Sequence, residues 1–448
     1  MSKRCFNKLI AILIALVITF SLVGCGNQTS ESSNQSSGGQ NSESQGTQPS
    51  APEREYNVYA LYFPNFGTQN PNKAWDPLVD CEWGTVNRAI TRFDGHIAHK
   101  PLWGYENHSD PKVMAKVIDA AVNYGVDGFF FDWYWYREAR LGGLGLNGSA
   151  DGIYLGAELE RGFLQAENCE NMEFAIYWCN HEALGWNPVF QDEEEWDIMT
   201  DYIIDNYMSR PNYARVDGKL YFGILSLTSF VEIFKNEYGM TDIRIAKEAL
   251  ESFNQKAIDK GLGEITFFVN DSQAQGVDAT AAWPGGLPPA GWDVYDFMGL
   301  DFAVNISISV PEKGIRYDLN PEGGVLDYDY YVDSNATFIE NSIKKSNAAG
   351  SYTFIPTLQV GYDPTIRISP YEDWDGAGSY PHGPILWNNT PDNIKKMSYN
   401  IRNLLDKYEL DTIFIGAWNE WGEGAFMEPC EEWGYGYLRA VKEVFGTK

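Results

Sequence analysis

Residues 126–135 read VDGFFFDWYW, a nearly unbroken run of apolar and aromatic side chains. A strand that is covered on both faces has such a run, whereas a strand with one face in water alternates apolar and polar residues. The stretch ITFFVND at 265–271 has the same character. Both stretches therefore predict buried strands of a parallel sheet whose outer face is covered by helices.

Helical segments separate such runs along the chain. Asp110 and Pro111 provide an N-cap and a first-turn proline before VMAKVIDAAVNYG at 113–125, which is a typical helix start. Segments 241–261 and 391–408 have similar features. Eight strand-like runs occur in all, near 56–64, 126–135, 172–180, 219–227, 264–271, 295–303, 352–360 and 410–418.

Eight alternating strand and helix units predict an α/β protein with a (β/α)8 TIM barrel as a single catalytic domain. The competing fold is a doubly wound open sheet. No glycine-rich phosphate-binding fingerprint supports that alternative.

The last run continues into TIFIGAWNEWGEGAFME at 412–428. Glu420 and Glu423 follow the strand directly, at the end where catalytic residues of barrels lie. Cleavage of a glycosidic bond needs one carboxyl that protonates the leaving oxygen and a second that acts as base or nucleophile. We therefore predict Glu420 and Glu423 as the catalytic pair, although an exposed acidic loop would also explain two nearby glutamates.

Polar and aromatic residues at the other strand ends are predicted to line the same rim. Each of them alone is more often a cap or turn residue, but together they favour a cleft, in which indole faces could support sugar rings. The predicted substrate-binding residues are Tyr62, Asp132, Trp133, Trp135, Trp178, Asn180, His181, Tyr362, Asp363, Trp418, Asn419, Trp421 and Glu428.

The N-terminus has the order of an export signal. Residues 1–25 contain three basic residues, an apolar run and the ending Leu-Val-Gly-Cys at Cys25. That ending resembles the bacterial lipobox, which implies cleavage before Cys25 and attachment of lipid to its thiol. An uncleaved anchor is the alternative, although the apolar run is short for a spanning helix. We expect an exported protein that is lipid-anchored at the extracytoplasmic face of the cell membrane.

Residues 26–54 are rich in Ser, Asn, Gln, Gly and Pro, and such a segment predicts a flexible linker. The catalytic domain is expected to span 55–448. The net charge of −29 argues against a nucleic-acid partner. With 15% aromatic residues, the composition suits a neutral or cationic carbohydrate.

The cysteines and histidines carry little information. Cys81, Cys169, Cys179 and Cys430 allow three disulfide connectivities, and free thiols are equally compatible with their spacing. The five histidines have no tight metal-ligand spacing. We predict no catalytic transition metal and no cofactor, and the sequence leaves a calcium ion held by loop carboxylates open.

Several motifs resemble those of one family. NEWGEG at 419–424, followed by Glu428 and Pro429, is similar to the last-strand motif of glycoside hydrolase family 99 and of the related WbsX-type domains, which are often labelled glycosyltransferases. GYDPTIR at 361–367 is similar to a second, fairly specific family segment. Weaker matches are VYALYFPNF at 58–66, Glu82-Trp83, YGVDGFFFDWYW at 124–135 and YWCNHE at 177–182, and the resemblance covers about residues 56–440.

The resemblance implies a (β/α)8 barrel and retaining hydrolysis of internal α-mannosidic bonds. In the family mechanism, the residue at Glu420 deprotonates the sugar 2-hydroxyl, which attacks its own anomeric carbon, and the residue at Glu423 protonates the leaving oxygen. Gly422 stands where family-99 mannosidases have a histidine, as in the WbsX-like group. From its place beside Trp421 we predict a raised pKa for Glu423, whereas Glu420 is expected to stay ionised.

Three other functions compete with a surface-anchored hydrolase. A glycosyltransferase would use a nucleotide sugar or a lipid-linked donor, and nucleotide sugars are cytoplasmic. No Asp-x-Asp motif lies at a predicted strand end, and DYDYY at 327–331 matches only as a string and opens a predicted helix. A sugar-binding lipoprotein would have two lobes instead of eight strand and helix units. A barrel that only binds glycan would not need Glu420 and Glu423. The sequence does not determine the linkage, exo or endo action, or the oligomeric state.

Overall fold

The computed structural model describes residues 55–72, 74–137, 152–181, 193–274, 277, 283, 288–289, 291–306, 314–376 and 380–446. The predicted signal peptide, the lipidation site Cys25 and the predicted linker all lie outside these residues. The predictions for residues 1–54 therefore stay predictions.

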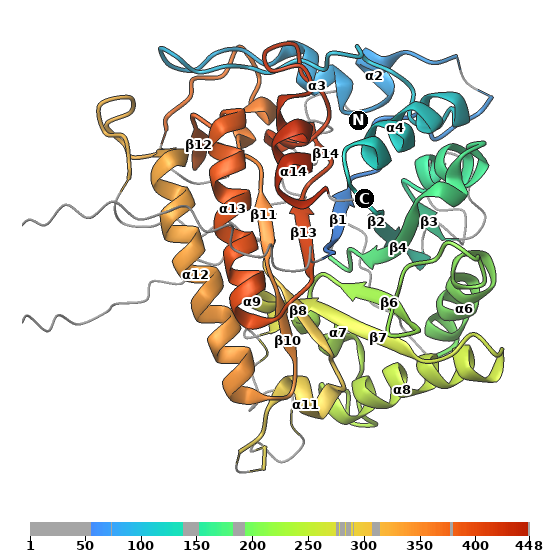
Figure 1. Cartoon of the computed structure of the whole chain (residues 1–448). Helices are drawn as coiled ribbons and strands as arrows, with labels where there is room; N and C mark the ends of the chain where they lie inside the picture. The colour runs from blue at the N-terminus through green and yellow to red at the C-terminus, as the bar shows by residue number, and fades with distance from the viewer. Residues whose placement is uncertain are drawn as a thin grey trace, which may run out of the picture.

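Nine parallel strands form the central sheet, in the order β10-β8-β7-β6-β4-β2-β1-β13-β11 (Figure 1). Only Pro356 separates β10 from β11, so the two are halves of one strand that closes the sheet between β8 and β13. The predicted eight-stranded barrel is thus confirmed. Its strands are β1 (Asn57–Tyr62), β2 (Gly128–Trp135), β4 (Glu173–Trp178), β6 (Lys219–Ile224), β7 (Ile265–Asn270), β8 (Phe302–Val304), β10 (Thr353–Ile355), β11 (Thr357–Gln359) and β13 (Thr412–Gly416).

Helices surround the barrel (Figure 1). The expected N-cap is present at Asp110, whose side chain accepts the Lys112 N–H at the start of α4. The predicted helices at 241–261 and 391–408 are also confirmed. The main helices are α4 (Pro111–Asn123), α6 (Glu193–Ile203), α7 (Leu227–Ile233), α8 (Ile243–Asp259), α12 (Tyr328–Ala349), α13 (Pro391–Tyr408) and α14 (Gly436–Phe445).

Shorter elements decorate this frame. The short strands are β3 (Ile153–Tyr154), β5 (Arg215–Val216), β9 (Val325–Asp327) and β12 (Ile385–Trp387). The short helices are α2 (Pro77–Asp80), α3 (Trp83–Arg88), α9 (Asp271–Ala274), α11 (Val294–Met298), η2 (Glu158–Gly162), η3 (Phe163–Gln165), η4 (Cys169–Asn171), η5 (Ile204–Met208) and η6 (Pro364–Arg367).

One predicted strand is largely a helix. We expected a strand over 295–303, but residues 294–298 form α11 and only Phe302–Val304 joins the sheet. The Asp293 carboxylate caps this helix by accepting the N–H groups of Tyr295 and Asp296, and Gly299 ends it in the left-handed conformation. These local signals outweighed the apolar content of the segment.

The barrel interior is filled by aromatic rings. Alternate residues of a strand face opposite sides, so one set points to the barrel axis and the other to the helices. Gly223 on β6 makes room for this packing, because a Cβ there would lie 2.3 Å from the rings of Tyr177 and Phe268. The inward rings in mutual contact are those of Tyr59, Phe130, Tyr177, Tyr221, Phe268, Phe302 and Phe414.

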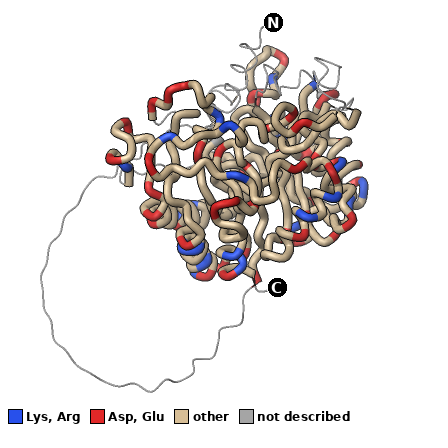
Figure 2. The backbone as a smooth tube through the Cα atoms, turned by 90° about the horizontal axis from the view of Figure 1, so that it is seen from above, with Lys and Arg blue, Asp and Glu red and all other residues tan. Residues whose placement is uncertain are grey.

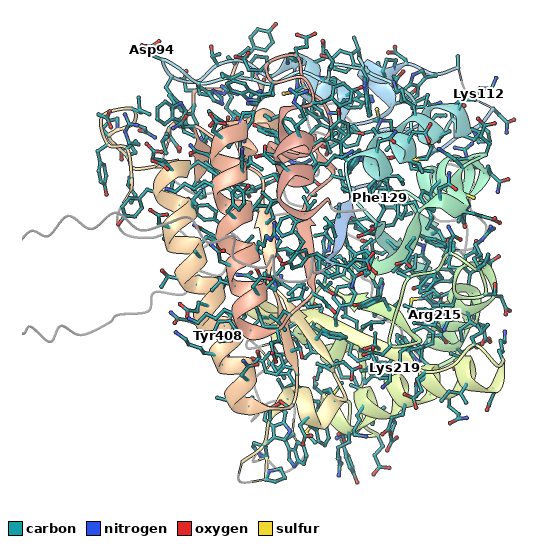
Figure 3. All side chains as sticks on the ribbon, in the orientation of Figure 1. Asp94, Lys112, Phe129, Arg215, Lys219 and Tyr408 are labelled. Atoms are coloured by element: carbon teal, nitrogen blue, oxygen red, sulfur yellow. The ribbon has the colours of Figure 1, made fainter. Side chains whose placement is uncertain are left out.

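The neighbouring position on β2 faces outward. Phe129, labelled in Figure 3, contacts the rings of Phe163 and Trp418 outside the barrel wall.

Charged residues of both signs are interspersed over the periphery (Figure 2). None of the described helices is both long and apolar enough to span a bilayer. The four cysteines of this part of the chain are free thiols.

Candidate active site

The segment after β13 carries both predicted catalytic carboxyls. It forms β14 (Asn419–Glu420), the single turn η7 (Trp421–Glu423) and β15 (Ala425–Phe426), which we call the rim hairpin. The hairpin follows the C-terminal end of β13, where a barrel places its active site. The Glu420 and Glu423 side chains are mostly buried and keep 16% and 13% exposure, so both reach solvent.

A single guanidinium joins the two carboxyls. Arg367, at the end of η6, lies 2.8 Å from Glu420 (Nη2 to Oε1) and 3.5 Å from Glu423 (Nε to Oε1). Its Nη1 also contacts the carboxylate of Glu82, at the N-terminus of α3. Three carboxyls therefore surround one cation that is itself only 10% exposed. We call these four residues the arginine cluster.

Burial raises the pKa values of both predicted catalytic carboxyls. Burial raises the pKa of Glu420 well above its usual range, and the charges of Glu423, Glu82 and Asp132 raise it further, against the opposing effect of Arg367. Burial also raises the pKa of Glu423, again opposed by Arg367. The prediction of a raised pKa for Glu423 is confirmed. The raised pKa of Glu420 opposes the expectation that Glu420 stays ionised, because burial affects both carboxyls.

Asp132 adds a fourth carboxyl at the end of β2. It shares the inward face of the strand with Phe130, and its pKa is raised to about 7 by burial, with a smaller contribution from the charge of Glu423. Tyr134, two residues further on, has the same orientation, and the charges of Asp132 and Glu420 raise the pKa of its hydroxyl in addition to burial. The site is therefore acidic and rimmed by phenols.

Comparison with known proteins identifies the family. A family model described as Glycosyltransferase WbsX matches residues 58–441. The chain belongs to the glycosyltransferase WbsX family. A relative named Uncharacterized protein WxcX, from Xanthomonas campestris pv. campestris, is 23% identical over 405 residues, which are 86% of this chain and 49% of the relative. The chain thus spans about half the length of the curated relatives it matches.

Solved structures share the barrel. A glycoside hydrolase-like protein has a TM-score of 0.52 at 14% identity, over 88% of this chain and 94% of that chain. The GH99 endo-alpha-mannosidase of Bacteroides thetaiotaomicron, in complex with bis-tris propane, has a TM-score of 0.50 at 14% identity, over 87% and 96%. At this identity the likeness shows the fold of the WbsX-family chain.

Among the predicted binding residues, the structure brings three to the acidic site. Asp132 faces the carboxyl pair, and Tyr362 lies near enough to Glu423 for that charge to raise the pKa of its phenol in addition to burial. His181 flanks Tyr134, with ring centroids 5.8 Å apart, and burial lowers the pKa of its imidazole to about 4. This histidine is therefore neutral at physiological pH.

The predicted sugar platforms on β2 and β4 are not at the site. Trp133, Trp135 and Trp178 occupy outward positions and are 2%, 2% and 0% exposed. The Trp133 indole donates to the Tyr207 hydroxyl and the Trp135 indole to Glu195, both outside the barrel. These three predictions are wrong because the two-residue period of the strands turns the indoles toward the helices.

Three polar predictions are structural contacts instead. Asn419 accepts the Phe63 N–H at 2.8 Å and donates to the Phe63 carbonyl at 2.9 Å, which ties the rim hairpin to the end of β1. Asn180 makes the same paired contact with the backbone of Ser226. The Tyr62 hydroxyl, on the outward face of β1, bonds His108 and Glu158. None of the three side chains has free polar atoms for a sugar in this arrangement.

Asp363 connects the segment that carries Arg367 to the rim hairpin. Its carboxylate accepts from His96 Nε2 at 2.7 Å and from the Thr365 backbone and hydroxyl, while its own N–H donates to the Glu423 carbonyl. The residue therefore joins η6, which carries Arg367, to the rim hairpin. The prediction that it binds substrate is replaced by this bridging role.

The last three predicted binding residues lie beneath the rim hairpin. Trp418 and Trp421 are fully buried, and Glu428 is 2% exposed. Each indole N–H donates to one oxygen of the Glu428 carboxyl. An open sugar platform made of these indoles is excluded by their burial, and the expected substrate contact of Glu428 is excluded by its occupied oxygens.

Four residues that surround the catalytic pair were not predicted from the sequence. Glu82 and Arg367 occur in segments that resemble the family, but nothing in their spacing indicated that they meet. Tyr134 could have been found from the strand period, because it faces the same side as Asp132. Tyr380 had no signal in the sequence, and its hydroxyl lies near Glu423, whose pKa it lowers slightly against the effect of burial.

Gly422 explains one departure of this WbsX-family chain from the mannosidases. A Cβ at this position would lie 2.0 Å from Glu82 Oε2 and 3.0 Å from Arg367 Nη2. Glu82 thus occupies the space that a side chain at 422 would need. A histidine at this position would therefore have to displace the Glu82 carboxylate.

We therefore expect Gly422→Ala to displace Glu82 and disturb the cluster. A misplacement of about 1 Å at a catalytic group can cost on the order of 10²-fold in rate, and kcat should fall by about that factor. Gly218→Ala, in the turn between β5 and β6, is the control for a loss of stability without a clash at the site. Its Cβ would meet nothing within 4 Å, and its φ of +82° strains only the local backbone. Steady-state kinetics measure kcat of both variants. A wild-type kcat in Gly422→Ala would show that the cluster tolerates the methyl group.

Three carboxyls around this site have pKa values raised by burial, to about 8 for Glu158 and about 7 for Glu428 and Asp132. Unfolded carboxyls titrate near 4, so between these values the native state binds protons that the unfolded state does not. Stability then falls as pH rises, by about 1.4 kcal/mol per pH unit for each protonated group. The buried histidines His99, His108 and His181 have lowered pKa values and act in the opposite direction, by about 0.4 kcal/mol each between pH 6.5 and 8, because an unfolded imidazole is still half protonated at pH 6.5.

We expect the free energy of unfolding to be about 2 kcal/mol or more lower at pH 8 than at pH 6.5. Urea titrations at the two pH values measure this difference. Glu158→Gln removes one of the three groups and should make the decrease smaller. Stability that is constant or increases over this range would contradict the raised pKa values.

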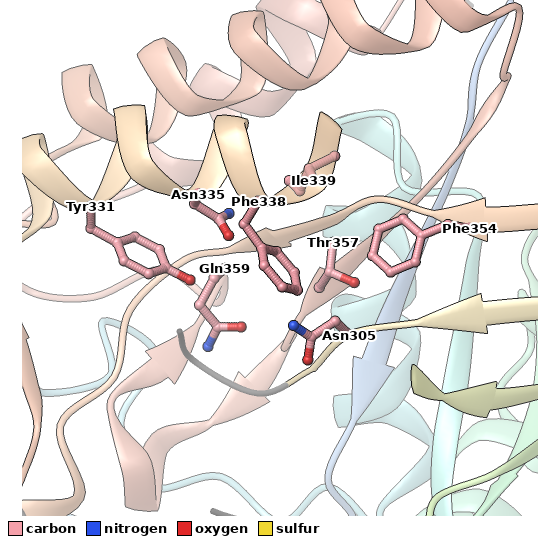
Figure 4. A pocket seen from close by; sticks show the side chains of 8 residues that line it. All are labelled: Asn305, Tyr331, Asn335, Phe338, Ile339, Phe354, Thr357 and Gln359. Carbon is pink, nitrogen blue, oxygen red and sulfur yellow. The ribbon is translucent and has the colours of Figure 1, made fainter. Parts of the chain in front are cut away.

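Among the described residues, no group of three or more His, Cys, Asp and Glu side chains has the arrangement of a metal site. A small pocket lies between α12 and the closing strand of the barrel (Figure 4), and none of its lining residues belongs to the arginine cluster. They are Asn305, Tyr331, Asn335, Phe338, Ile339, Phe354, Thr357 and Gln359.

Proposed function

We propose that the protein is a glycoside hydrolase that cleaves O-glycosidic bonds of a glycan or polysaccharide with Glu420 and Glu423. The observation that supports this most is the pair of partly exposed carboxyls with raised pKa at the C-terminal end of β13, held by one guanidinium. A carboxyl that keeps its proton near neutral pH can act as general acid. A neighbouring carboxylate can then activate a nucleophile.

The two roles are assigned by the contacts of Arg367. Its shorter contact is with Glu420, at 2.8 Å compared with 3.5 Å for Glu423. A guanidinium at that distance favours the ionised carboxylate. We therefore assign the shared negative charge to Glu420 and the proton to Glu423, against the stronger effect of burial on the pKa of Glu420. Glu420 then acts as the base, toward the sugar 2-hydroxyl in a retaining α-mannosidase mechanism, and Glu423 protonates the leaving oxygen and later activates water.

The electrostatics also favour a neutral or basic sugar. Four carboxyls face the site in the described part of the chain, and the cation of the cluster is already paired with three of them. A uronate, a sulfated sugar or the diphosphate of a nucleotide sugar would meet net negative charge there. This disfavours the nucleotide-sugar transferase that the family description suggests, and it disfavours acidic polysaccharides as substrates.

A glycan panel tests the proposal. The protein is incubated with neutral and acidic oligosaccharides, including α-mannans, and separately with nucleotide sugars plus acceptors. We expect reducing ends from at least one neutral glycan, and loss of this release in Glu423→Gln. Transfer from a nucleotide sugar without release in water would instead support the glycosyltransferase, and tight binding without turnover would support a glycan-binding barrel.

We further propose that the chain is anchored by lipid at Cys25 and acts at the extracytoplasmic face of the membrane. The motivation is the order of basic, apolar and small residues in 1–25. Cys25→Ala should leave the membrane fraction or remain unprocessed. A variant that fractionates and migrates like the wild type would contradict the anchor.

A further inference from the structure

The carboxyl of Glu428 lies directly beneath the rim hairpin. Its Oε1 accepts the Trp418 indole N–H at 3.1 Å, and its Oε2 accepts the Trp421 indole N–H at 2.6 Å. Glu428 is 2% exposed and both indoles are fully buried. One carboxyl therefore bridges two indoles, and neither oxygen is directed to a substrate.

The two indoles flank Glu420 in the sequence and precede Glu423. Glu420 lies between Trp418 and Trp421, and Glu423 follows two residues later. The backbone closes the same unit, because the N–H groups of Met427 and Glu428 both donate to the Trp418 carbonyl. The position of Glu420 relative to the barrel is thus fixed from below by Glu428 and from the side by Arg367.

The Trp421 indole is also locked on its face. It stacks on the Phe426 ring with centroids 3.8 Å apart and an interplanar angle of 10°. This stacking leaves the ring little freedom except to slide or tilt, and the hydrogen bond to Glu428 opposes both motions. Trp421 begins the turn that carries Glu423, so its position sets the height of that carboxyl above the barrel.

Only a carboxyl can make this bridge. It offers one acceptor oxygen to each indole, whereas the amide of glutamine offers one oxygen and one N–H2 group. A glutamine at position 428 would therefore direct a donor at one indole N–H and leave that N–H buried without an acceptor. The two indoles could then no longer be held at the same time.

We propose that Glu428 is a positioning residue, which holds the catalytic pair Glu420 and Glu423 in register with Arg367 through the indoles of Trp418 and Trp421. The inference rests on the proposed glycosidase function only for its kinetic consequence. Its structural content, the bridge between two indoles beneath the hairpin, is independent of the reaction.

Glu158 provides a matched control. It is a fully buried glutamate that lies, like Glu428, beside His108, but its oxygens accept from the Phe66 backbone and the Tyr62 hydroxyl and do not contact the rim hairpin. Glu158→Gln and Glu428→Gln make the same chemical change at similar burial. A difference between the two variants thus reports the bridge and not the loss of a buried carboxyl.

The first measurement is kinetic, on a glycan that the wild type cleaves. We expect Glu428→Gln to lower kcat by about 10- to 100-fold, as for a small misplacement of catalytic groups, with KM within twofold because no substrate contact is lost. Glu158→Gln should keep kcat within about threefold. A merely structural role would lower the melting temperature and leave kcat of the folded protein unchanged, and this result would overturn the proposal.

A double-variant cycle isolates the mechanism. Trp418→Phe removes one of the two donors, so the single acceptor oxygen of the amide in Glu428→Gln can serve Trp421 alone. We expect Glu428→Gln with Trp418→Phe to lose less kcat than the two single variants combined. Losses that simply multiply would contradict a shared bridge. Should Glu428→Gln fail to fold, Trp418→Phe and Trp421→Phe each remove one bond, and the proposal requires a lower kcat at unchanged KM in both.

A crystal structure of Glu428→Gln separates this inference from the proposed function. We expect the hairpin to shift and the contact of 2.8 Å between Arg367 and Glu420 to lengthen or break. An undisturbed contact would overturn the positioning role. If the wild type cleaves no glycan at all, the proposed function fails, and the crystallographic result still decides whether Glu428 positions the hairpin.

Discussion

Glu423→Gln will lower kcat on a natural glycan by about 10²–10⁴-fold, the usual loss for removal of a general acid. The reason is that the leaving oxygen departs as an alkoxide when no proton is supplied. With an activated glycoside, such as a nitrophenyl glycoside or glycosyl fluoride of the same sugar, the leaving group needs little protonation, and the loss should be much smaller. Steady-state kinetics on the two substrates measure the difference.

Glu420→Gln is the matched variant for this test. Its task does not depend on the leaving group, so its loss should be similar on the natural and the activated substrate. Equal losses for Glu423→Gln on both substrates would contradict its assignment as the acid, and a loss for Glu420→Gln that disappears on the activated substrate would reverse the two roles. Full activity of either variant would remove the pair from the mechanism.

Arg367→Met will destabilise the protein by about 3–5 kcal/mol at pH 7, as is usual when one partner of a buried ion pair is removed. The guanidinium is 10% exposed and contacts three carboxyls, which would then repel one another. Without the cation their folded-state pKa values rise further above the unfolded value near 4, so the deficit should be small at acidic pH and grow as pH rises. Urea unfolding at pH 5 and pH 8 measures it.

Arg244→Met is the control for this change. Its side chain is 55% exposed and pairs with Asp242 at 2.8 Å, so its removal should change the free energy of unfolding far less than Arg367→Met does. Activity of Arg367→Met should also fall by about 10²-fold or more, because the charge of Glu420 is no longer stabilised. An Arg367→Met protein as stable as the control at pH 8 would contradict the charge balance of the cluster.

The sequence predicted the barrel correctly because its signals are local. Buried parallel strands such as 126–135 are continuous apolar runs, and N-cap residues such as Asp110 mark the starts of the helices between them. The exception at 295–303 is also local in origin, since the Asp293 cap and Gly299 form a helix inside an apolar stretch. Eight such units have few ways to pack other than a closed barrel.

Fewer of the predicted binding residues were correct, because alternate residues of a strand face opposite sides and only one set points to the site. Asp132 and Trp133 are neighbours in one strand, yet one faces the carboxyl pair and the other is 2% exposed behind the wall. The structure shows which face of β2 points inward, because the Phe130 ring packs among the rings of the barrel interior. A strict alternation from Phe130 would have selected Asp132 and Tyr134 and rejected Trp133 and Trp135.

The arginine cluster was beyond reach of spacing arguments. Glu82 and Arg367 are 285 residues apart and meet through two loops on the rim. No periodicity connects such loops, and only the closed barrel brings them to the hairpin. The same holds for the bridge of Glu428, which looked like a rim carboxyl in the sequence and is a buried acceptor in the fold.

Hydrolysis by the pair Glu420 and Glu423 is the central claim, and the origin of the oxygen in the product tests it most directly. A glycan that the protein cleaves is digested in water enriched in the heavy oxygen isotope, and the released reducing sugar is analysed by mass spectrometry. The account predicts that the wild type places solvent oxygen on the anomeric carbon and that Glu420→Gln with Glu423→Gln releases no sugar. Labelled product from that double variant, or wild-type transfer of the glycosyl group without solvent oxygen, would contradict the account.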